Sequence, residues 1–496
     1  MTFEIVFVLL SLLGMVAALV ADKMRPGMIL FSVVVLFLCA GILTPKEMLE
    51  GFSNKGMITV ALLFLVSEGI RQSGTLGQVI KKLLPQGKTT VFKAQLRILP
   101  SVAFISAFLN NTPVVVIFAP IIKHWAKSVN LPATKFLIPL SYVTILGGIC
   151  TLIGTSTNLV VHGMILEAGF EGFSMFELGK VGIFIAIAGI IYIFLFSKRL
   201  LPDARPDTAV PDEEVEEGEK LHRVEAVLGA RFPGINKKLK DFNFQRHYGA
   251  EVKEIKTRNG QRFVTNLDDV VLHEGDTLVV MADDTFIPTW GESSVFVLLT
   301  NGNEPDTTGK KKRWFALLLL VLMIVGATVG ELPVTKEMFP DIKLDMFFFV
   351  SITTIIMAWT NLFPARKYTK YISWDILITI ACAFAISKAM VNSGVADSVA
   401  KFIIGLSDDY GPHVLLAMLF IITNLFTELI TNNAAAALAF PLALSIASQL
   451  GVSPTPFFVV ICMAASASFS TPIGYQTNLI VQGIGNYKFT DFVRIG

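Results

Sequence analysis

The sequence has little charge for its length. Charged residues make up only 16% of the 496 residues, while hydrophobic residues make up 53% and the mean hydropathy is +0.64. A soluble protein of several domains would carry more charge, and several apolar runs are long enough to cross the ~30 Å of a bilayer core. The formal net charge of +2 gives no electrostatic sign of a nucleic-acid partner, and none is predicted. The chain is therefore expected to be an α-helical integral membrane protein.

Features of secreted proteins and of enzymes are scarce as well. The four cysteines lie in apolar segments without motif spacing, so they predict packing residues and no disulfide framework. The sequence has no Walker loop, no GxGxxG and no nucleophile–base set, so neither an enzyme nor an organic cofactor is predicted. The first apolar segment, residues 3–20, has no basic n-region and no cleavage site and is expected to remain as a spanning helix.

Apolar runs and polar intervals divide the chain into two membrane halves with a soluble insert. Residues 1–202 and 314–496 are the two predicted membrane repeats. Between them, 203–218 has the proline-containing acidic composition of a linker, and 291–313 is a second linker. Residues 219–290 read as a small soluble α/β domain, with alternating strand patterns near 250–255 and 277–281.

The two membrane halves repeat each other. The tetrapeptide at 110–113 (NNTP) matches 431–434 (TNNA), and 153–159 (IGTSTNL) matches 473–479 (IGYQTNL). Several matches in the same order and at nearly constant spacing indicate an internal repeat.

The charges beside the polar tetrapeptides indicate how the two repeats lie in the membrane. Residues 71–97 contain six basic residues and no acidic ones, and Lys123, Lys127 and Lys135 follow, so both flanks of 96–122 are predicted to be cytoplasmic. A segment with both ends on one side is re-entrant, with its tip at 110–113. The flanks of the second copy carry few basic residues and are predicted to be external, so the repeats are expected to be inverted.

Polar groups within apolar segments need a reason. Non-helical backbone at membrane depth is tolerated only where protein or a water-filled cavity satisfies its polar groups. Re-entrant hairpins and broken helices supply helix N-termini that favour anions and free carbonyl groups that suit sodium. The helix breaks are predicted at 154–158 and 474–478. The alternative is that these Asn and Thr side chains only hold packed helices together.

The two re-entrant hairpins and two broken helices resemble the divalent anion:sodium symporter family of the ion-transporter superfamily, over nearly all of both halves. The family has Ser-Asn-Thr at each hairpin tip, where this chain has Asn110-Asn111-Thr112 and Thr431-Asn432-Asn433, and a Gly-Thr-Pro-Pro-Asn-like break, where it has GTSTN and GYQTN. The resemblance implies two or more sodium ions as coupling ions, held by Ser106, Asn110, Asn111, Gly154 and Asn158 in one half and by Thr427, Ile430, Asn432, Gly474 and Asn478 in the other. It implies that the anion is bound by Asn110, Asn111, Thr112, Thr157, Thr431, Asn432, Asn433 and Thr477.

The function that follows is sodium-coupled symport of a small divalent anion across the plasma membrane (the inner membrane in a bacterium), by elevator-type alternating access. Sulfate is favoured because short donors converge on a small volume and because the prolines of the family break are replaced by Ser156, Thr157, Gln476 and Thr477. Sodium-coupled dicarboxylate transport is the alternative. A channel or a membrane sensor, gated through the inserted domain, is a further alternative.

The insert resembles the TrkA C-terminal (RCK-C) domain, through residues 244–250 (FQRHYGA) and 272–280 (LHEGDTLVV). The resemblance implies a cytoplasmic regulatory module and a homodimer. A small-molecule regulator of unknown identity and a role in assembly alone are the two alternatives for this domain.

Three charged residues in apolar segments invite interpretation. Glu68 and Lys388 occupy equivalent positions in the two repeats, so they are expected either to form an ion pair or to lie near helix ends with their charges in water. Glu428, beside the second tip, is expected to have a proton- or cation-linked role or to act as a hydrogen-bonding strut.

The last residues match a segment that precedes a spanning helix in the first repeat. Residues 489–496 correspond to 173–182, which lead into an apolar run ending near 196. The second repeat is therefore expected to lack its closing helix, either because ~20 residues are omitted or because a neighbouring subunit covers that flank. The omission is the preferred expectation.

Overall fold

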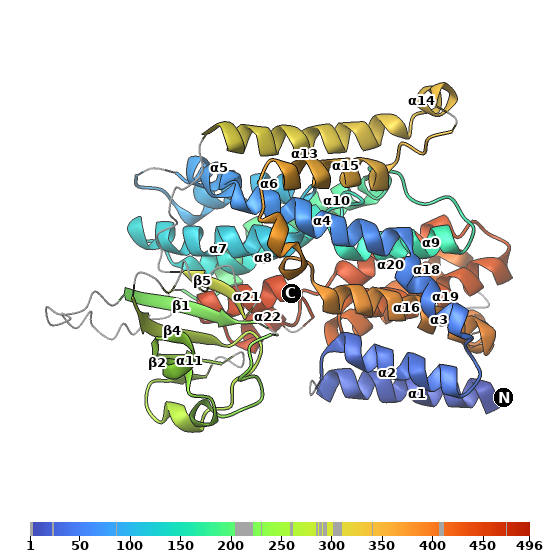
Figure 1. Ribbon diagram of the computed structural model, residues 1–496, viewed down its shortest axis with the longest axis horizontal. Helices are drawn as coiled ribbons and strands as arrows, with labels where there is room; N and C mark the ends of the chain where they lie inside the picture. Colours follow the sequence, from blue (N-terminus) through green and yellow to red (C-terminus); the bar gives the residue numbers. More distant parts are fainter. Residues whose placement is uncertain are drawn as a thin grey trace, which may run out of the picture.

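The computed structural model describes residues 3–21, 24–85, 87–203, 222–229, 231–257, 261–283, 286, 290, 295–300, 310–339, 341–405, 411–472 and 474–496. The membrane halves are helical (Figure 1). The first half contains α1 (Phe3–Ala21), α2 (Pro26–Cys39), α3 (Pro45–Glu50), α4 (Lys55–Gln72), α5 (Thr75–Leu83), α6 (Val91–Ser106), α7 (Asn111–Ser128), α8 (Leu137–Gly148), α9 (Ser156–Glu167) and α10 (Gly179–Leu200). The second half contains α13 (Lys310–Gly330), α14 (Pro333–Met338), α15 (Met346–Trp359), α16 (Trp374–Asn392), α17 (Val395–Gly405), α18 (Gly411–Leu429), α19 (Asn432–Leu450), α20 (Thr455–Ser466), α21 (Gln476–Gly485) and α22 (Phe489–Ile495).

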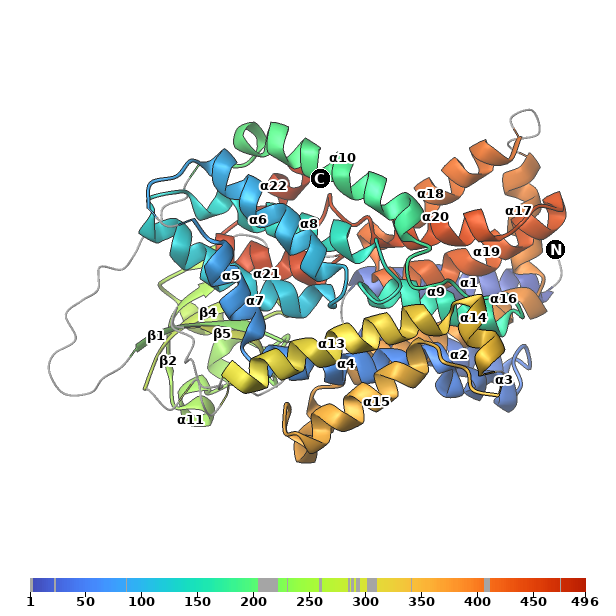
Figure 2. The same ribbon diagram turned by 90° about the horizontal axis from the view of Figure 1, so that it is seen from above.

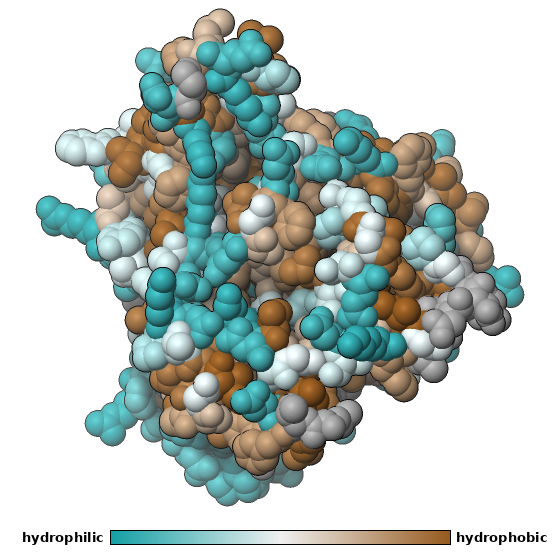
Figure 3. Space-filling view, turned by 90° about the vertical axis from the view of Figure 1, so that its right-hand side faces the viewer, coloured by the Kyte–Doolittle hydropathy of each residue, from teal (hydrophilic) through white to brown (hydrophobic). Residues whose placement is uncertain are grey.

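Seven of the described helical segments are long and apolar enough to cross a membrane: α1, residues 45–72, α10, α13, α16, α18 and α19. The long helices run roughly along the horizontal direction of both ribbon views (Figures 1 and 2). Apolar side chains on them are exposed, as on a lipid-facing surface: Phe184 and Leu195 of α10 are 73% and 67% exposed. Figure 3, which looks onto one end of the helices, shows polar side chains in teal between apolar areas in brown. This chain is a multi-pass membrane protein.

Both predicted hairpins are present, with tips slightly displaced from the sequence prediction. The first tip is the four residues 107–110 between α6 and α7, so Thr112 and Pro113 lie in the first turn of α7 rather than in the tip. A proline is tolerated in that turn because its missing N–H would have no partner within the helix. The second tip is shorter and consists of Ile430 and Thr431, between α18 and α19.

Both predicted helix breaks are present and are longer than predicted. The first lies between Gly148 and Ser156 and the second between Ser466 and Gln476. Within the second, Ile473 lies outside the described residues. Asn158 and Asn478, which were predicted to lie in the breaks, belong to the first turns of α9 and α21.

The two halves exchange packing partners. Helix α2 of the first half packs on α16 of the second, and α15 of the second half packs on α4 of the first. Figure 1 shows the two outer helix pairs, α1–α2 and α13–α15, on opposite sides of the molecule. In the interior, α7 packs on α21 and α19 packs on α9. Each hairpin therefore lies against the broken helix of the other half, which is how a repeat related by a twofold axis packs. The inverted orientation of the repeats in the membrane stays a prediction.

The insert is an antiparallel sheet with a short helix. Its strands β1 (His222–Leu228), β2 (Glu251–Lys256), β3 (Arg262–Phe263), β4 (Thr277–Ala282) and β5 (Phe296–Thr300) are ordered β3-β2-β4-β1-β5, with α11 (Phe244–Tyr248) beside them. The two strands predicted from alternation are β2 and β4. Because β5 pairs with β1, the domain extends beyond the predicted limit at residue 290. Residues 204–218 of the predicted acidic linker lie outside the described residues.

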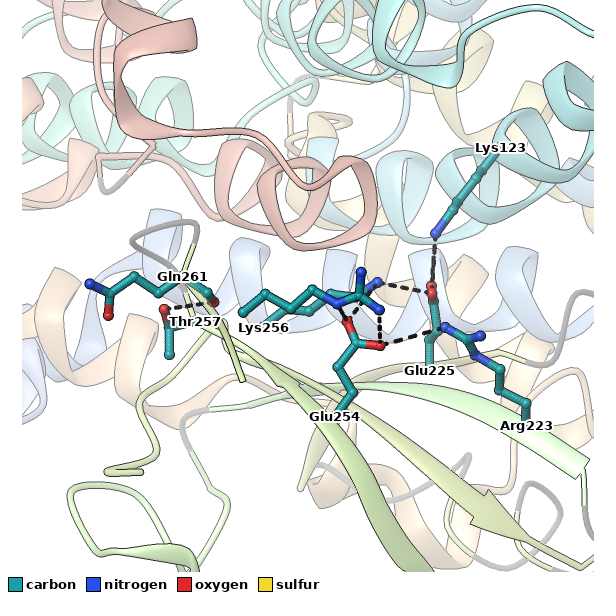
Figure 4. A network of polar contacts seen from close by, with 8 residues as sticks. Lys123, Arg223, Glu225, Glu254, Lys256, Thr257 and Gln261 are labelled. Atoms are coloured by element: carbon teal, nitrogen blue, oxygen red, sulfur yellow. Dashed lines mark hydrogen bonds and ion pairs between the residues drawn. The ribbon is translucent and has the colours of Figure 1, made fainter. Parts of the chain in front are cut away.

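The sheet rests on the membrane halves. Lys123 Nζ of α7 lies 3.1 and 3.2 Å from the two carboxylate oxygens of Glu225 on β1 (Figure 4). Strand β4 also packs closely on α21 at Gly483. A Cβ atom added at this glycine would lie only 2.5 Å from the hydroxyl oxygen of Thr277 on β4. The insert therefore contacts α7, which begins at the first hairpin tip, and α21, which begins at the second helix break.

Of the two expectations for Glu68 and Lys388, the ion pair is wrong. Glu68 instead accepts hydrogen bonds from Arg71 and Gln72, both at 2.6 Å, near the end of its own helix α4. Lys388 is exposed near the end of α16. Both residues therefore lie near helix ends, as the second expectation states. At these positions each charged side chain reaches a polar partner or water without crossing the interior.

Candidate binding site at the hairpin tips and helix breaks

The first hairpin tip surrounds one buried amide with oxygen atoms. Asn111 is 1% exposed at the start of α7. With the amide turned so that each atom has a complementary partner, its NH2 group has three acceptors within hydrogen-bonding distance for its two hydrogens: Ser106 Oγ (2.8 Å), Thr144 O (3.1 Å) and Gly154 O (3.3 Å). The predicted sodium ligands Ser106, Asn111 and Gly154 therefore meet at one point, together with a carbonyl group of α8 that the sequence reading missed.

The second tip has a matching pair of side chains. Thr427 Oγ1 donates to Asn432 Oδ1 at 2.8 Å, and the distance and the spacing of five residues equal those between Ser106 and Asn111, whatever the direction of the bond. A Cβ at Gly474 would lie only 2.5 Å from the Thr427 carbonyl oxygen, so this glycine is in contact with the pair. Ile430 is buried beside them and can offer only its backbone carbonyl group. Thr427, Ile430, Asn432 and Gly474 thus lie together, as predicted.

One asparagine braces each break. Asn158 Nδ2 donates to the carbonyl oxygens of Gly148 (3.3 Å) and Thr151 (2.8 Å). Asn478 Nδ2 makes the equivalent bonds to residues 468 (2.9 Å) and 471 (3.1 Å). These bonds satisfy carbonyl groups that the broken helix leaves without helical partners. The geometry gives both asparagines a structural role, and their role as sodium ligands stays a prediction.

Each tip reaches the break of the other half. Thr112 Oγ1 at the first tip donates to Gln476 Oε1 at 3.3 Å. At the equivalent place on the other side, Asn433 Oδ1 accepts from Ser156 and Thr157, both at 3.4 Å. These contacts follow from the packing of α7 on α21 and of α19 on α9. The predicted anion ligands Thr112, Thr157 and Asn433 therefore lie at the two junctions between the halves.

Tyr475 lies between the two tips and was missed by the sequence reading. Its side chain is 8% exposed, and its hydroxyl group lies 2.5 Å from the Asn111 amide and 3.0 Å from Thr155 Oγ1. The Asn432 side chain of the second tip lies near this hydroxyl group. One hydroxyl group thus contacts the asparagine of the first tip and the break of the other half. The signal was available, because Tyr475 is the repeat counterpart of Thr155 and is the only aromatic residue in either five-residue break motif.

Three other predicted anion ligands are placed differently. Thr477 accepts a hydrogen bond from Ser141 of α8 at 2.9 Å, so it ties α21 to α8 rather than facing a tip. Asn110 lines a small cavity with Ser67 and Ser156. Thr431 Oγ1 is buried and has no hydrogen-bond partner among the described residues, which leaves it available to a ligand.

The electrostatics of the site come from helix ends. Helices α7, α9, α19 and α21 all begin at the tips and breaks, and helix N-termini favour negative charge. Within the described part of the chain, the hydrogen bonds and ion pairs of the tips and breaks include no Lys or Arg side chain. Nearby, Glu428 Oε1 accepts from the backbone N–H groups of Phe469 and Ser470, both at 2.9 Å, as a strut would.

Comparison with known proteins identifies the family. A family model described as a citrate transporter matches residues 16–447 and 338–495. The chain belongs to the citrate transporter family. It is 30% identical to an uncharacterised transporter of Synechocystis over 94% of this chain and 89% of the relative. It is 28% identical to a putative sulfur deprivation response regulator of Chlamydomonas reinhardtii over 94% of both chains. A probable sodium/sulfate cotransporter of the same alga is 23% identical over 96% of this chain and 84% of the relative.

Membership of this transporter family confirms the resemblance inferred from the hairpins and breaks, since the family is of the divalent anion:sodium symporter type. The likeness of the insert to a TrkA C-terminal domain stays a prediction. Family membership directs attention to the hairpin tips and helix breaks as the candidate transport site. The matching groups of side chains at the two tips identify the oxygen and nitrogen atoms that could bind an ion there.

Proposed function

We propose that this member of the citrate transporter family is a sodium-coupled symporter of a small divalent anion, with sulfate as the preferred substrate. The proposal rests above all on one observation: Ser106–Asn111 and Thr427–Asn432 form matching pairs, each at 2.8 Å, at the two tips. Each pair lies beside a glycine of a break. Two equivalent groups of hydroxyl, amide and carbonyl oxygens are suitable for two sodium ions.

The sodium ions would also solve an electrostatic problem for the anion. The contacts of the tips include four helix N-termini but, among the described residues, no cationic side chain. Helix N-termini favour an anion only by partial charges. Bound sodium would be the largest positive charge in the site. Coupling then follows, because an anion without its sodium ions would lack a countercharge.

Two observations favour sulfate over a dicarboxylate. The space between the tips is occupied by the Tyr475 side chain, so the room for a second carboxylate is small. The chain also aligns over 96% of its length with a probable sodium/sulfate cotransporter. Sodium-coupled dicarboxylate transport is the second candidate, favoured by the citrate transporter description of the family.

Several finer features belong to this proposal. Transport would be of the elevator kind, with hairpins and broken helices moving against the remaining helices. The protein would be a homodimer in the plasma membrane with the insert in the cytoplasm, where a small molecule could regulate it. The placement of the insert is supported by the basic start of α13, at 310–313, on the same side as the sheet in Figure 1.

Uptake of radiolabelled sulfate into proteoliposomes tests the proposal. Wild-type protein is expected to show saturable uptake that requires an inward sodium gradient, and Asn111→Ala and Asn432→Ala are each expected to abolish it. Asn392→Ala, which removes an exposed asparagine at the end of α16, is the control and should transport normally. Uptake indifferent to sodium would contradict symport and favour a channel. Succinate uptake that sulfate fails to inhibit would favour the dicarboxylate.

A further inference from the structure

The two orientations of the Asn111 amide have different consequences for Tyr475. In one, Asn111 Nδ2 points to Ser106, Thr144 and Gly154, and its oxygen accepts the hydroxyl proton of Tyr475 at 2.5 Å. In the other, Oδ1 accepts from Ser106 Oγ at 2.8 Å and Nδ2 donates to the Tyr475 oxygen at 2.5 Å. The heavy atoms occupy the same positions in both. Only the direction of the hydrogen bonds changes.

A cation would select between these orientations. In the second orientation, Oδ1 faces the carbonyl oxygens of Thr144 and Gly154, which cannot donate to it. Asn111 Oδ1 then lies 2.8–3.3 Å from three other oxygen atoms, and this arrangement is favourable only with a positive charge among them. Without the cation, the first orientation is favoured because it places the two amide hydrogens among these oxygens. Sodium binding at the first tip is therefore expected to turn the amide.

Turning the amide releases a donor in the centre of the site. A tyrosine hydroxyl has one hydrogen and two lone pairs. While Asn111 Oδ1 accepts that hydrogen, Tyr475 has no proton to give to an anion. When Asn111 Nδ2 donates instead, the hydrogen is free to turn toward the space beside Thr155, the other group to which the Tyr475 hydroxyl is hydrogen-bonded.

We propose that the Tyr475 hydroxyl is a direct ligand of the transported anion, and that sodium at the first tip makes its proton available through the amide of Asn111. This inference rests on the proposed function and adds a specific coupling residue to it. It explains why a buried phenol stands where the second break meets the first tip. Thr155, which matches Tyr475 in the other half, has too short a side chain to reach the tip asparagine of the opposite half in the same way, so the coupling would belong to one half of the molecule.

The test compares Tyr475→Phe with Tyr487→Phe in the full-length protein. Both replacements remove a buried tyrosine hydroxyl that is hydrogen-bonded, but Tyr487 bonds to the backbone of residues 134 and 138, away from the tips. Two quantities are measured: sodium binding without sulfate, and the KM for sulfate uptake at low and high sodium. Size-exclusion chromatography confirms that each variant is folded.

Tyr475→Phe is expected to leave sodium binding within twofold of wild type while raising the sulfate KM roughly tenfold to a hundredfold, the loss of one hydrogen bond to a charged group. In wild-type protein, high sodium is expected to lower the sulfate KM by some factor, and this factor measures the coupling between the sodium and sulfate sites. In Tyr475→Phe the factor is expected to fall roughly tenfold to a hundredfold as well. Tyr487→Phe is expected to change neither quantity.

Three results would overturn the inference. A sulfate KM within twofold of wild type in Tyr475→Phe would show that the hydroxyl is not a ligand. Loss of sodium binding in the same variant would make Tyr475 part of the sodium site instead. If wild-type protein takes up no sulfate with sodium present, both the proposed function and this inference are wrong. The first two results, by contrast, concern the variant alone and leave the proposed function standing.

Discussion

Replacing Glu225 should loosen the contact between the inserted domain and the membrane halves in a way that depends on pH. Burial alone would raise the pKa of the Glu225 carboxyl, but the positive charges of Lys123, Lys256 and Arg223 outweigh it and lower the pKa from 4.5 to about 2. At about 1.4 kcal/mol per pH unit, this lowering corresponds to roughly 3 kcal/mol of stability in the charged state. Figure 4 shows Glu225 between Lys123 of α7 and the basic side chains of the sheet.

The sign of the pH dependence follows from the direction of the pKa shift. Because the folded state lowers the pKa, the stabilisation is fully present above pH 4.5 and is lost as the pH falls toward 2. Glu225→Gln is therefore expected to lower the thermal unfolding midpoint by several °C at pH 7, and the difference from wild type is expected to shrink between pH 4.5 and pH 3. Scanning fluorimetry of the purified protein in detergent measures both midpoints.

A matched control is available on β2, which β4 separates from β1 in the sheet. Glu251 of β2 pairs with Lys253 at 2.7 Å, but both side chains are more than half exposed, so Glu251→Gln should change stability by less than about 1 kcal/mol. Adding Lys123→Met to Glu225→Gln isolates the contact with α7, with an expected coupling of about 0.5–3 kcal/mol. A midpoint difference between wild type and Glu225→Gln that stays constant from pH 7 to pH 3 would refute the reasoning.

Three further variants test the break and its surroundings. Asn158→Ala removes the bonds to the carbonyl groups of residues 148 and 151 and is expected to cost about 1–3 kcal/mol of stability and to reduce uptake; an unchanged unfolding midpoint would contradict the bracing role. Gly154→Ala would place a Cβ 2.5 Å from the Gly148 carbonyl oxygen and is expected to abolish uptake, whereas Gly14→Ala on α1, which meets nothing within 4 Å, should transport normally. Glu428→Gln keeps an acceptor for the backbone N–H groups of residues 469 and 470 and is expected to retain most of the uptake at every pH; a selective loss of pH dependence in proteoliposomes would indicate a proton-linked role instead.

The packing of one half on the other could not be read from the chain. Spacing placed Asn111 and Asn432 in equivalent tips, but it did not show that each tip faces the break of the opposite half. That arrangement depends on α7 packing against α21 and α19 against α9, which are contacts between segments more than 250 residues apart. For the same reason, the sequence reading missed Thr144, whose carbonyl oxygen approaches Asn111 from another helix.

Two expectations drawn from local sequence patterns differ from the structure. Equivalent positions in a repeat suggested that Glu68 and Lys388 meet, yet Glu68 found a nearer partner in Arg71, three residues along the same helix. The predicted linker at 291–313 includes the strand β5, and only the pairing of β5 with β1 shows that it belongs to the sheet.

The sequence by itself determined the membrane class, the matching polar motifs of the two halves and the places where polar groups interrupt the apolar helices. Those properties depend on hydropathy and spacing, which are local and periodic. The tertiary structure decided which polar groups meet: the Ser106–Asn111 and Thr427–Asn432 pairs, the braces across the breaks, and above all the position of Tyr475. Its hydroxyl can contact Asn111 and Thr155 only because the packing of one half on the other brings the second break against the first tip, and no single segment of the chain contains that information.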